Sequence, residues 1–499
     1  MTIADVLSGV PVRGALPESL ARLEVSGLEY DSRRVATGYL FFAFPGARVD
    51  GRVFAGQAGE RGAVAVVSEL PAPDDAGVPW IQVEHGRHAL AMAAKTFYGK
   101  PDETVALTGI TGTNGKTTTS YLLDSILRAA GRTTMLAGTI EYRLGAKVLP
   151  ASNTTPESLD LMRMLAELVL MAGGEKAATM EISSHALALG RVYGLHFHTA
   201  VFSNLTRDHL DFHHTMEDYF AAKELLFAGS GGPAPKYAVI NRDDEWGRKL
   251  GEKRRDSEVL WYGLGADAMV RARNVHSGID GLRFEVVFEK VRFEVQSPLI
   301  GKINVYNILA ACAAGMTHQL APEVIARGIG ACPGVPGRFE RVDEGQPFAV
   351  VVDYSHTDDA LRNAIAVARS LDAKRVITLF GCGGDRDRTK RPLMGKVAGE
   401  FSDLVILTSD NPRSEEPLQI MNDVMVGLKR TDTRTIVEPD RAVAIRKAIE
   451  EAHAGDVVIL AGKGHETYQI FKDRTIHFDD RETAREVLRA FGFRKQVAL

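Results

Sequence analysis

The segment that most constrains the fold is residues 108–119, which read TGITGTNGKTTT. Residues 104–110 before it have the apolar character of a strand, and residues 116–130 carry apolar positions at helical spacing. A glycine-rich turn between a strand and a helix binds phosphates through backbone N–H groups and the helix N-terminus. The segment therefore predicts an α/β unit that binds ATP or GTP, with a plain helix N-cap as the alternative.

The spacing of this loop departs from the usual Walker form, which would place glycine at Ile110. We expect Lys116 to reach the outer phosphates and the Thr117 hydroxyl to coordinate Mg²⁺. The predicted nucleotide-binding residues of the loop are Gly112, Thr113, Asn114, Gly115, Lys116, Thr117 and Thr118.

The length of 499 residues predicts about three domains. We place them at 1–102, 103–332 and 333–499, with breaks near Gly99-Lys-Pro101 and in residues 333–337, PGVPG. Strand-like runs alternate with helical stretches in all three, which predicts an α/β fold throughout.

Composition excludes several classes of protein. A net charge of −4 with interspersed acidic and basic residues gives no electrostatic footprint for nucleic acid. The three cysteines are far apart, so we expect neither disulfides nor a zinc site. No signal sequence and no apolar run long enough to span a bilayer is apparent, which predicts a cytoplasmic protein without membrane insertion.

Two polar residues follow apolar strand-like runs. Glu181 ends one such run, and His209 lies in residues 204–211, NLTRDHLD. Both are candidate ligands of Mg²⁺ near the phosphates. The alternatives, left open at even odds, are a helix-capping carboxylate and a hydrogen-bonded loop histidine.

Lys223 lies within an apolar helical stripe formed with Met216, Phe220 and Phe227. Desolvation lowers the pKa of a lysine, and a neutral amine can add CO₂ to become a carbamate that coordinates metal. From the residues alone, a lysine whose ammonium reaches solvent is the more frequent outcome.

Three further residues are candidates for contacts with the nucleotide. Asn307 lies at a helix start and has both a donor and an acceptor for an adenine edge. Arg338 and Asp353 flank the entry to the third domain, where they suit phosphate and ribose. A helix cap and a set of salt bridges at a domain hinge are the respective alternatives.

Charged residues follow three apolar strands of the third domain. Arg386, Arg413 and Glu466 lie at these strand ends, a set that suits an amino acid with carboxylate and ammonium groups. A dinucleotide-binding fingerprint fails here, because its third glycine would fall at Arg386.

Together these motifs resemble the Mur ligases, ATP-dependent amide-forming enzymes of peptidoglycan precursor synthesis. The resemblance rests on the GTNGKT loop, on Asn153-Thr-Thr-Pro156, on Ala221-Ala-Lys223 and on Asp410-Asn-Pro-Arg413, and it covers nearly the whole chain. It implies a UDP-binding N-terminal α/β domain, a central P-loop ATPase-like domain with a mostly parallel sheet, and a Rossmann-like C-terminal domain.

The resemblance also implies the reaction. Meso-2,6-diaminopimelate would be joined to UDP-N-acetylmuramoyl-L-alanyl-D-glutamate through an acyl phosphate, with ATP as co-substrate and Mg²⁺ as cofactor. The implied catalytic residues are Lys116, Lys223, Glu181 and His209, and the implied metal ligands are Thr117, Glu181, His209 and Lys223 as a carbamate. We expect a monomer that binds only these small molecules.

The resemblance also implies the substrate contacts, which we assign by matching the family's motifs to positions in this sequence. The nucleotide-sugar contacts are Tyr30, Ser32, Ala47, Arg48, Val49, Asn153, Thr154, Thr155, Ser183, Leu189 and Arg191. Leu189 stands where some members of the family have glutamine, and residues 354–359 read YSHTDD in place of YAHTPD. The diaminopimelate contacts are Arg386, Asp410, Asn411, Pro412, Arg413, Gly462 and Glu466.

Three rival functions remain at this point. A lysine-adding ligase is disfavoured by Arg413, because diaminopimelate differs from lysine by a distal carboxylate. A folylpolyglutamate synthase is disfavoured by Asp31-Ser-Arg33 in the first domain. A nucleotide-switched regulator would need neither Glu181, Lys223 and His209 nor an amino-acid pocket.

Overall fold

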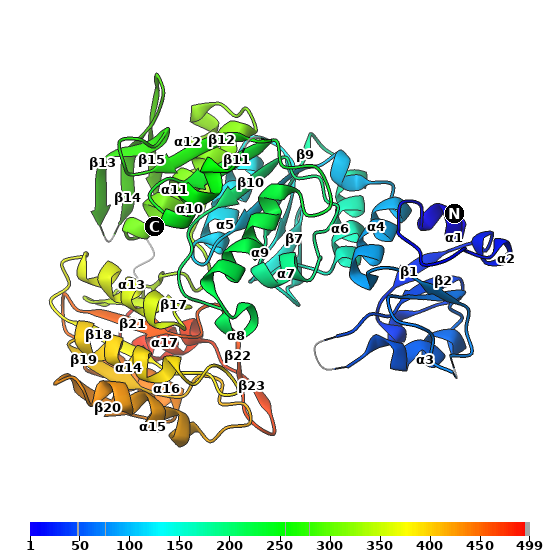
Figure 1. Ribbon diagram of the computed structural model, residues 1–499. Helices are drawn as coiled ribbons and strands as arrows, with labels where there is room; N and C mark the ends of the chain where they lie inside the picture. The colour runs from blue at the N-terminus through cyan, green and yellow to red at the C-terminus, as the bar shows by residue number, and fades with distance from the viewer. Residues whose placement is uncertain (47–48, 75, 255, 279, 495–499) are drawn as a thin grey trace. The chain divides into compact units, whose positions relative to one another are not determined.

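The computed structural model describes residues 1–46, 49–74, 76–254, 256–278 and 280–494. Its contacts divide the chain into two compact units. The first contains Met1–Leu205, Phe212–Arg271 and Leu309–Gly328, and the second contains Thr206–Asp211, Ala272–Ile308 and Ile329–Leu499. Strands alternate with helices in both (Figure 1), which confirms the predicted α/β class.

A four-stranded parallel sheet, in the order β1-β2-β3-β4, begins the first unit. Side chains of β2 alternate between two apolar clusters, with Leu40 and Phe42 in one and Phe41 in the other, so both faces of the sheet are covered. The elements are α1 (Ile3–Val6), α2 (Glu18–Ala21), β1 (Gly27–Glu29), η1 (Ser32–Arg34), β2 (Tyr39–Phe42), η2 (Gly51–Phe54), α3 (Ala55–Glu60), β3 (Ala65–Ser68), β4 (Trp80–Gln82), α4 (Gly86–Phe97) and η3 (Pro101–Glu103).

The first unit also holds eight adjoining strands of an 11-stranded sheet, in the order β12-β11-β10-β5-β9-β6-β7-β8. Strands β12 to β6 of this order are parallel, and β7 and β8 are antiparallel additions. The elements are β5 (Ala106–Thr111), α5 (Lys116–Ala129), β6 (Thr133–Ala137), β7 (Glu141–Leu144), β8 (Lys147–Pro150), α6 (Ser158–Leu170), β9 (Lys176–Glu181), α7 (Ser184–Ala188), β10 (Thr199–Phe202), α8 (Leu210–His213), α9 (Met216–Ala228), β11 (Tyr237–Asn241), α10 (Glu245–Glu252) and β12 (Glu258–Gly263). The residues of helices α11 (Lys302–Thr317) and α12 (Pro322–Ala331) are divided between the two units, with Leu309–Gly328 assigned to the first.

The register of this sheet places three loops at one edge. Ile110 of β5 pairs with Glu181 of β9, and Thr111 of β5 pairs with Phe202 of β10. Because these strands are parallel, the residues that follow them emerge together, where ligands of α/β proteins usually bind. The predicted phosphate loop and Glu181 therefore lie at the same edge.

The second unit contains a six-stranded sheet in the order β16-β17-β21-β18-β19-β20 and a small β22-β23 hairpin. Antiparallel strands β14 and β15 form a further ladder next to β13. The elements are β13 (Val270–Gly278), β14 (Gly281–Phe288), β15 (Val291–Ser297), β16 (Glu340–Val342), β17 (Ala349–Asp353), α13 (Asp358–Arg369), β18 (Val376–Phe380), α14 (Lys390–Phe401), β19 (Leu404–Leu407), α15 (Pro417–Leu428), β20 (Arg434–Val437), α16 (Arg441–Glu450), β21 (Val457–Ala461), β22 (Tyr468–Ile470), β23 (Thr475–His477) and α17 (Asp480–Ala490).

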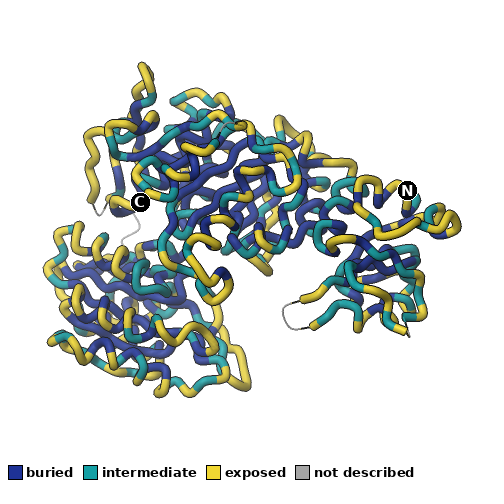
Figure 2. Tube along the Cα trace, viewed as in Figure 1, coloured by how far each residue is buried: buried dark blue, intermediate teal, exposed yellow. Residues whose placement is uncertain are grey.

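Helices cover both faces of the six-stranded sheet. Val351 of β17 packs in a cluster with residues of α13, α14 and α15, whereas Val350 and Val352 pack with residues of α16 and α17. Figure 2 shows the strands of this sheet as buried and the outer sides of its helices as exposed. This doubly wound arrangement agrees with the alternation predicted for the third domain.

Two predictions from composition concern the whole chain. Cys312, Cys332 and Cys382 are all buried, and within the described residues none of them forms a disulfide. Within the described residues, we find no helix that combines the length and the apolar character needed to cross a membrane.

A buried histidine lies beneath the larger sheet of the first unit. His318 Nε2 is 2.9 Å from Thr108 Oγ1, and Nδ1 is 3.0 Å from Arg132 Nη1. A guanidinium group can only donate, so Nδ1 accepts and the ring is neutral. Burial, then the neighbouring His198 and Arg132, lower the pKa of His318 from 6.5 to about 3.

This lowered pKa predicts acid lability of the first unit. The unfolded chain binds a proton at His318 below about pH 6.5 and the folded chain does not, so stability falls as the pH falls. We expect a loss of about 2 kcal/mol between pH 7 and pH 5, measured by hydrogen exchange of the β5 amides. His318→Gln should lose less over this range, and the exposed-site control His276→Gln should behave like the wild type; equal losses in all three would contradict the assignment.

Candidate functional site

The predicted phosphate loop connects β5 to α5 as the sequence indicates. Gly112 has φ +143° and Gly115 has φ +88°, values that favour glycine. A Cβ at Gly112 would lie 1.9 Å from Ser203 Oγ, so only glycine fits there. Helix α5 starts at Lys116, and its N-terminal N–H groups provide the anion-binding end of a 14-residue helix.

The end of β10 holds this loop in place. Thr113 N donates to Asn204 O at 2.8 Å, and Asn114 N donates to Asn204 Oδ1 at 3.0 Å. Ser203 Oγ donates to Asn114 O at 2.6 Å. The loop conformation is thus fixed by neighbouring backbone and side chains before any nucleotide binds.

Two lysines converge on one carbonyl oxygen of the loop. Lys116 Nζ donates to Gly112 O at 2.9 Å and to Thr113 O at 2.8 Å, and Lys223 Nζ donates to Gly112 O at 2.7 Å. Lys223 is 1% exposed, so the alternative in which its ammonium reaches solvent is wrong. Two ammonium groups at one carbonyl oxygen repel each other, and the negative charge of a bound phosphate would offset this repulsion.

Glu181 is fully buried and accepts three hydrogen bonds. Thr117 Oγ1 donates to Oε2 at 2.9 Å, and Thr139 donates to Oε2 through its hydroxyl at 3.0 Å and to Oε1 through its backbone N–H at 2.8 Å. The capping alternative is wrong, because Ser183 caps the following helix α7. Glu181 and Thr117 therefore place two oxygen atoms that could coordinate a hard metal ion side by side at the phosphate loop.

This donor set fits Mg²⁺, which prefers oxygen ligands and keeps several waters. In the described part of the chain, no group of three or more His, Cys, Asp or Glu side chains is arranged to hold a metal by itself. His209 belongs to the second unit, has φ +54°, and lies 3.5 Å through Nε2 from Asp208 Oδ2. Its role as a metal ligand stays a prediction.

The predicted peptide-binding residues surround the same strand ends. Thr155 Oγ1 donates to Glu181 O at 2.8 Å and accepts from Ser183 N at 3.1 Å. Arg191 Nη1 donates to Thr155 O at 3.1 Å, and the hydroxyl oxygens of Thr139 and Thr154 lie 3.2 Å apart, so that Thr154 donates while Thr139 donates to Glu181. Asn153 contacts Tyr142 Oη through its backbone, and Leu189 ends α7. The structure thus brings Asn153, Thr154, Thr155, Ser183 and Arg191 together next to Glu181.

The predicted uridine contacts lie in the small N-terminal sheet region. Tyr30 Oη donates to Asp160 Oδ2 on α6, and Ser32 Oγ donates to Gln57 Oε1 at 2.6 Å. Val49 is exposed, and Ala47 and Arg48 lie outside the described residues. The hydroxyls of Tyr30 and Ser32 already have protein partners, so their role as uridine contacts stays a prediction.

Three predicted nucleotide contacts belong to the second unit. The Asn307 side chain donates to Asn304 Oδ1 at 2.8 Å. Asp353 accepts from Phe339 N at 2.7 Å and from Ser355, and burial raises the pKa of its carboxyl. The Arg338 guanidinium lies 4.9 Å from the centre of the Tyr354 ring. Asp353 is therefore held in a fixed position near Arg338 and Tyr354.

The side chains of both arginines predicted for the amino-acid pocket lie close to Gly383. A Cβ at Gly383 would lie 2.9 Å from Arg413 Nη1 and 3.7 Å from Arg386 Cγ. Arg413 Nη1 donates to Gly384 O at 2.8 Å, and Arg413 adopts φ +52°. The loops after β18 and β19 therefore bring the two arginine side chains to the same glycine.

The loop after β21 contacts the loop that follows β19. Asn411 Nδ2 donates to Glu466 Oε2 at 2.8 Å, and a Cβ at Gly462 would lie 2.9 Å from Asp410 Oδ2. Burial, and then the Asp410 carboxylate, raise the pKa of Glu466. Asp410, Asn411 and Pro412 are buried. Because β21, β18 and β19 are neighbours in the sheet, the seven predicted diaminopimelate contacts gather at one edge.

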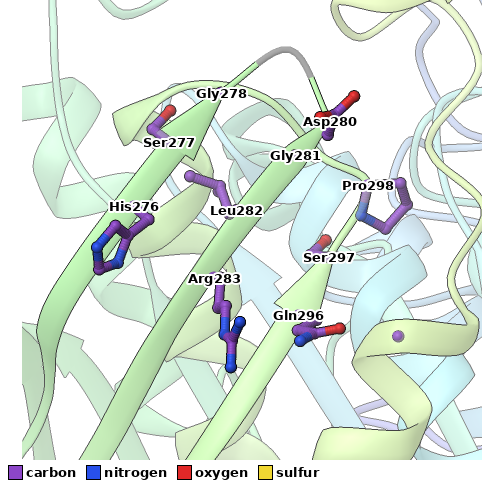
Figure 3. A pocket seen from close by; sticks show the side chains of 11 residues that line it. His276, Ser277, Gly278, Asp280, Gly281, Leu282, Arg283, Gln296, Ser297 and Pro298 are labelled. Carbon is purple, nitrogen blue, oxygen red and sulfur yellow. The ribbon is translucent and has the colours of Figure 1, made fainter.

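A surface hollow of about 600 Å³ occurs elsewhere in the second unit, at β13, β14 and β15 (Figure 3). None of the predicted site residues lines it. Its side chains include His276, Asp280, Arg283 and Gln296. The hollow is therefore not the predicted site.

The structure adds residues that the sequence patterns did not identify. Thr139 hydrogen-bonds Glu181, and it follows β6 as other site residues follow their strands, so this signal was available. Glu157 accepts from Arg87 Nη1 at 2.7 Å and lies 3.5 Å from Arg191 Nε. Lys463 contacts Glu466 from within the same glycine-rich loop.

Family models match three parts of the chain. The "Mur ligase family, catalytic domain" matches residues 24–98, the "Mur ligase middle domain" matches residues 110–315, and the "Mur ligase, glutamate ligase domain" matches residues 337–464. The middle-domain match contains the phosphate loop, Glu181 and Lys223. The last match contains both arginines of the predicted pocket.

Individual proteins match over nearly the whole length. The chain is 66% identical over 493 residues to a UDP-N-acetylmuramoyl-L-alanyl-D-glutamate–2,6-diaminopimelate ligase from Solibacter usitatus, covering 99% of both chains. A solved structure with that ligase name matches at 32% identity and a TM-score of 0.70, over 99% of this chain and 100% of its own. MurF ligase from Thermotoga maritima, solved in complex with ADP, matches at 18% identity and a TM-score of 0.62, over 94% of this chain and 97% of its own.

Proposed function

Because the chain belongs to the Mur ligase family, we propose that it joins meso-2,6-diaminopimelate to UDP-N-acetylmuramoyl-L-alanyl-D-glutamate at the expense of ATP. The product is a peptidoglycan precursor, and ADP and phosphate are released. The relative from Solibacter usitatus carries the name of this activity. The observation that carries the substrate assignment is the meeting of Arg386, Arg413 and Glu466 at adjoining strand ends.

The first step transfers the γ-phosphoryl group of ATP to the side-chain carboxylate of the D-glutamate residue. A carboxylate oxygen attacks phosphorus, the bond to the β-phosphate oxygen breaks, and ADP leaves. The acyl phosphate activates a carbonyl that an amine would otherwise not attack. Lys116 and the N–H groups at the start of α5 stabilise the negative charge on the transferring group.

Thr117, Glu181, His209 and Lys223 as a carbamate would hold Mg²⁺ in this proposal. When bound, the ion offsets charge on the phosphate oxygens. Support for the carbamate comes from the buried position of Lys223 and from the shared carbonyl of Gly112, where a second ammonium group is unfavourable. Addition of CO₂ to a neutral Lys223 amine, with loss of one proton, would replace that ammonium by an anion.

In the second step, the neutral amine of diaminopimelate attacks the acyl carbonyl, and the tetrahedral intermediate loses phosphate. Arg386 and Arg413 would bind carboxylate groups of the amino acid, since a guanidinium group binds a carboxylate bidentately. Glu466 would bind an ammonium group. The protein mainly positions the two reactants.

The division into domains at 1–102, 103–332 and 333–499 is part of the proposal. The three family-model ranges support it, because each falls within one predicted domain. We also propose that the enzyme acts in the cytoplasm, where ATP is available to it, and that it acts as a monomer.

The testing experiment is ATP-dependent phosphate release with the nucleotide-sugar dipeptide and meso-diaminopimelate, L-lysine or no amino acid. We expect fast release with diaminopimelate, release slower by about 10²-fold or more with L-lysine, and none without an amino acid. Release with lysine at a rate similar to that with diaminopimelate would keep the mechanism but contradict the assigned specificity. Phosphate release at the same rate with and without an amino acid would contradict the assignment as a ligase and favour a nucleotide-switched regulator.

A further inference from the structure

Two donors converge on one oxygen of the Glu466 carboxylate. Asn411 Nδ2 donates to Oε2 at 2.8 Å, and Lys463 Nζ donates to the same oxygen at 3.2 Å. Among the described residues, no hydrogen bond to Oε1 of Glu466 is found. One edge of the carboxylate is thus fixed by the protein, and the other is left for a ligand.

Lys463 is an unusual lysine, because its side chain is 0% exposed. Its ammonium also donates to Tyr468 O and approaches Asn411 Oδ1 at 3.4 Å, and it lies 5.6 Å from the centre of the Tyr468 ring. A buried ammonium group is costly unless it is paired and hydrogen-bonded. Its partners Asn411 and Glu466 lie in the loops that form the predicted amino-acid pocket, and Tyr468 begins β22, so the Lys463 side chain is held in place from both.

We propose that Lys463 is a positioning residue for the amino-acid substrate: together with Asn411 it holds Oε2 of Glu466, so that Oε1 binds the ammonium group of the substrate. The inference rests on the proposed function, because it assigns the ligand of Glu466 as an amino acid. It makes Lys463 a determinant of diaminopimelate affinity without contact to the reacting atoms.

Charge supports this role. Burial raises the pKa of Glu466, the Asp410 carboxylate raises it further, and the Lys463 ammonium and the Asn411 hydrogen bond lower it. Tyr354, Tyr468 and Arg441 also interact electrostatically with Glu466. Lys463 thus favours the anionic form of Glu466, which binds an ammonium group better than a neutral carboxyl does.

The test is steady-state kinetics of Lys463→Met, with Lys447→Met as the matched control, since Lys447 pairs with Glu438 elsewhere in the second unit. We expect the KM for diaminopimelate to rise about tenfold or more in Lys463→Met, with the KM values of ATP and the nucleotide sugar unchanged. The acid limb of kcat/KM for diaminopimelate should move to higher pH. Lys463→Gln keeps a donor but loses the charge, so it should show the pH shift with a smaller rise in KM.

A double-mutant cycle with Glu466→Gln separates positioning from a structural role. We expect Lys463→Met to change kcat/KM by less than about threefold in the Glu466→Gln background, because Lys463 acts through that carboxylate. Equal effects in both backgrounds, or an unchanged KM and pH profile in Lys463→Gln, would overturn the inference. Absence of diaminopimelate-dependent turnover in the wild type would instead contradict the proposed function.

Discussion

We expect Lys116→Met to lower kcat for phosphate release by about 10³-fold, equivalent to about 4 kcal/mol of transition-state stabilisation. Lys116 Nζ is folded onto the phosphate loop, 2.9 Å from Gly112 O and 2.8 Å from Thr113 O. A nucleotide phosphate would compete for this ammonium, because a charged acceptor binds it more strongly than a carbonyl does. Methionine has a similar length but no charge. Asn204 and Ser203 still hold the loop in this variant, so its main loss is the cation.

The measurement is single-turnover formation of the acyl phosphate, combined with calorimetric binding of an ATP analogue. Lys147→Met is the control, because Lys147 on β8 pairs with Glu167 at 3.2 Å and both side chains are more than half exposed. We expect the control to match the wild type. A Lys116→Met enzyme within threefold of wild-type kcat would exclude this loop as the phosphate site.

The sequence predicted the strands well, because buried parallel strands are continuous apolar runs that end in polar turns. Residues 104–110 and the apolar run that ends at Glu181 are predicted as strands, and β5 (Ala106–Thr111) and β9 (Lys176–Glu181) occupy these positions. The same pattern predicts Glu181 at the end of a strand, and Glu181 is the last residue of β9. Local sequence is therefore enough to predict the class of fold and the edge of the sheet at which the site forms.

Contacts between distant segments could not be predicted in this way. The hydrogen bond between Thr139 and Glu181 joins residues 42 positions apart, and its existence depends on the pairing of β6 with β9. Lys223 was recognised as unusual, but helical spacing alone favoured an ammonium in solvent. Its bond to Gly112 O spans 111 positions and comes from the packing of α9 against the phosphate loop.

The second large effect is expected for Arg413→Leu, which should lower kcat/KM for diaminopimelate by about 10²-fold, or about 3 kcal/mol. Arg413 is held by its backbone N–H, which donates to Ile470 O at 3.0 Å, and by Nη1, which donates to Gly384 O at 2.8 Å. Among the residues that the structure describes, no second hydrogen bond of this guanidinium group is found, so its other N–H groups can bind a ligand carboxylate. Arg413→Lys should lose less, because a lysine supplies the charge without the bidentate geometry.

The decisive quantity for Arg413 is the ratio of kcat/KM for diaminopimelate to that for L-lysine. Lysine lacks the distal carboxylate, so Arg413→Leu should leave its turnover little changed and reduce the ratio about 10²-fold. Arg434→Leu is a suitable control, since Arg434 is exposed and pairs with Glu451 at 2.6 Å away from the predicted pocket. If both amino acids lost activity equally, Arg413 would bind a group that they share, and selection of diaminopimelate would have to come from Arg386.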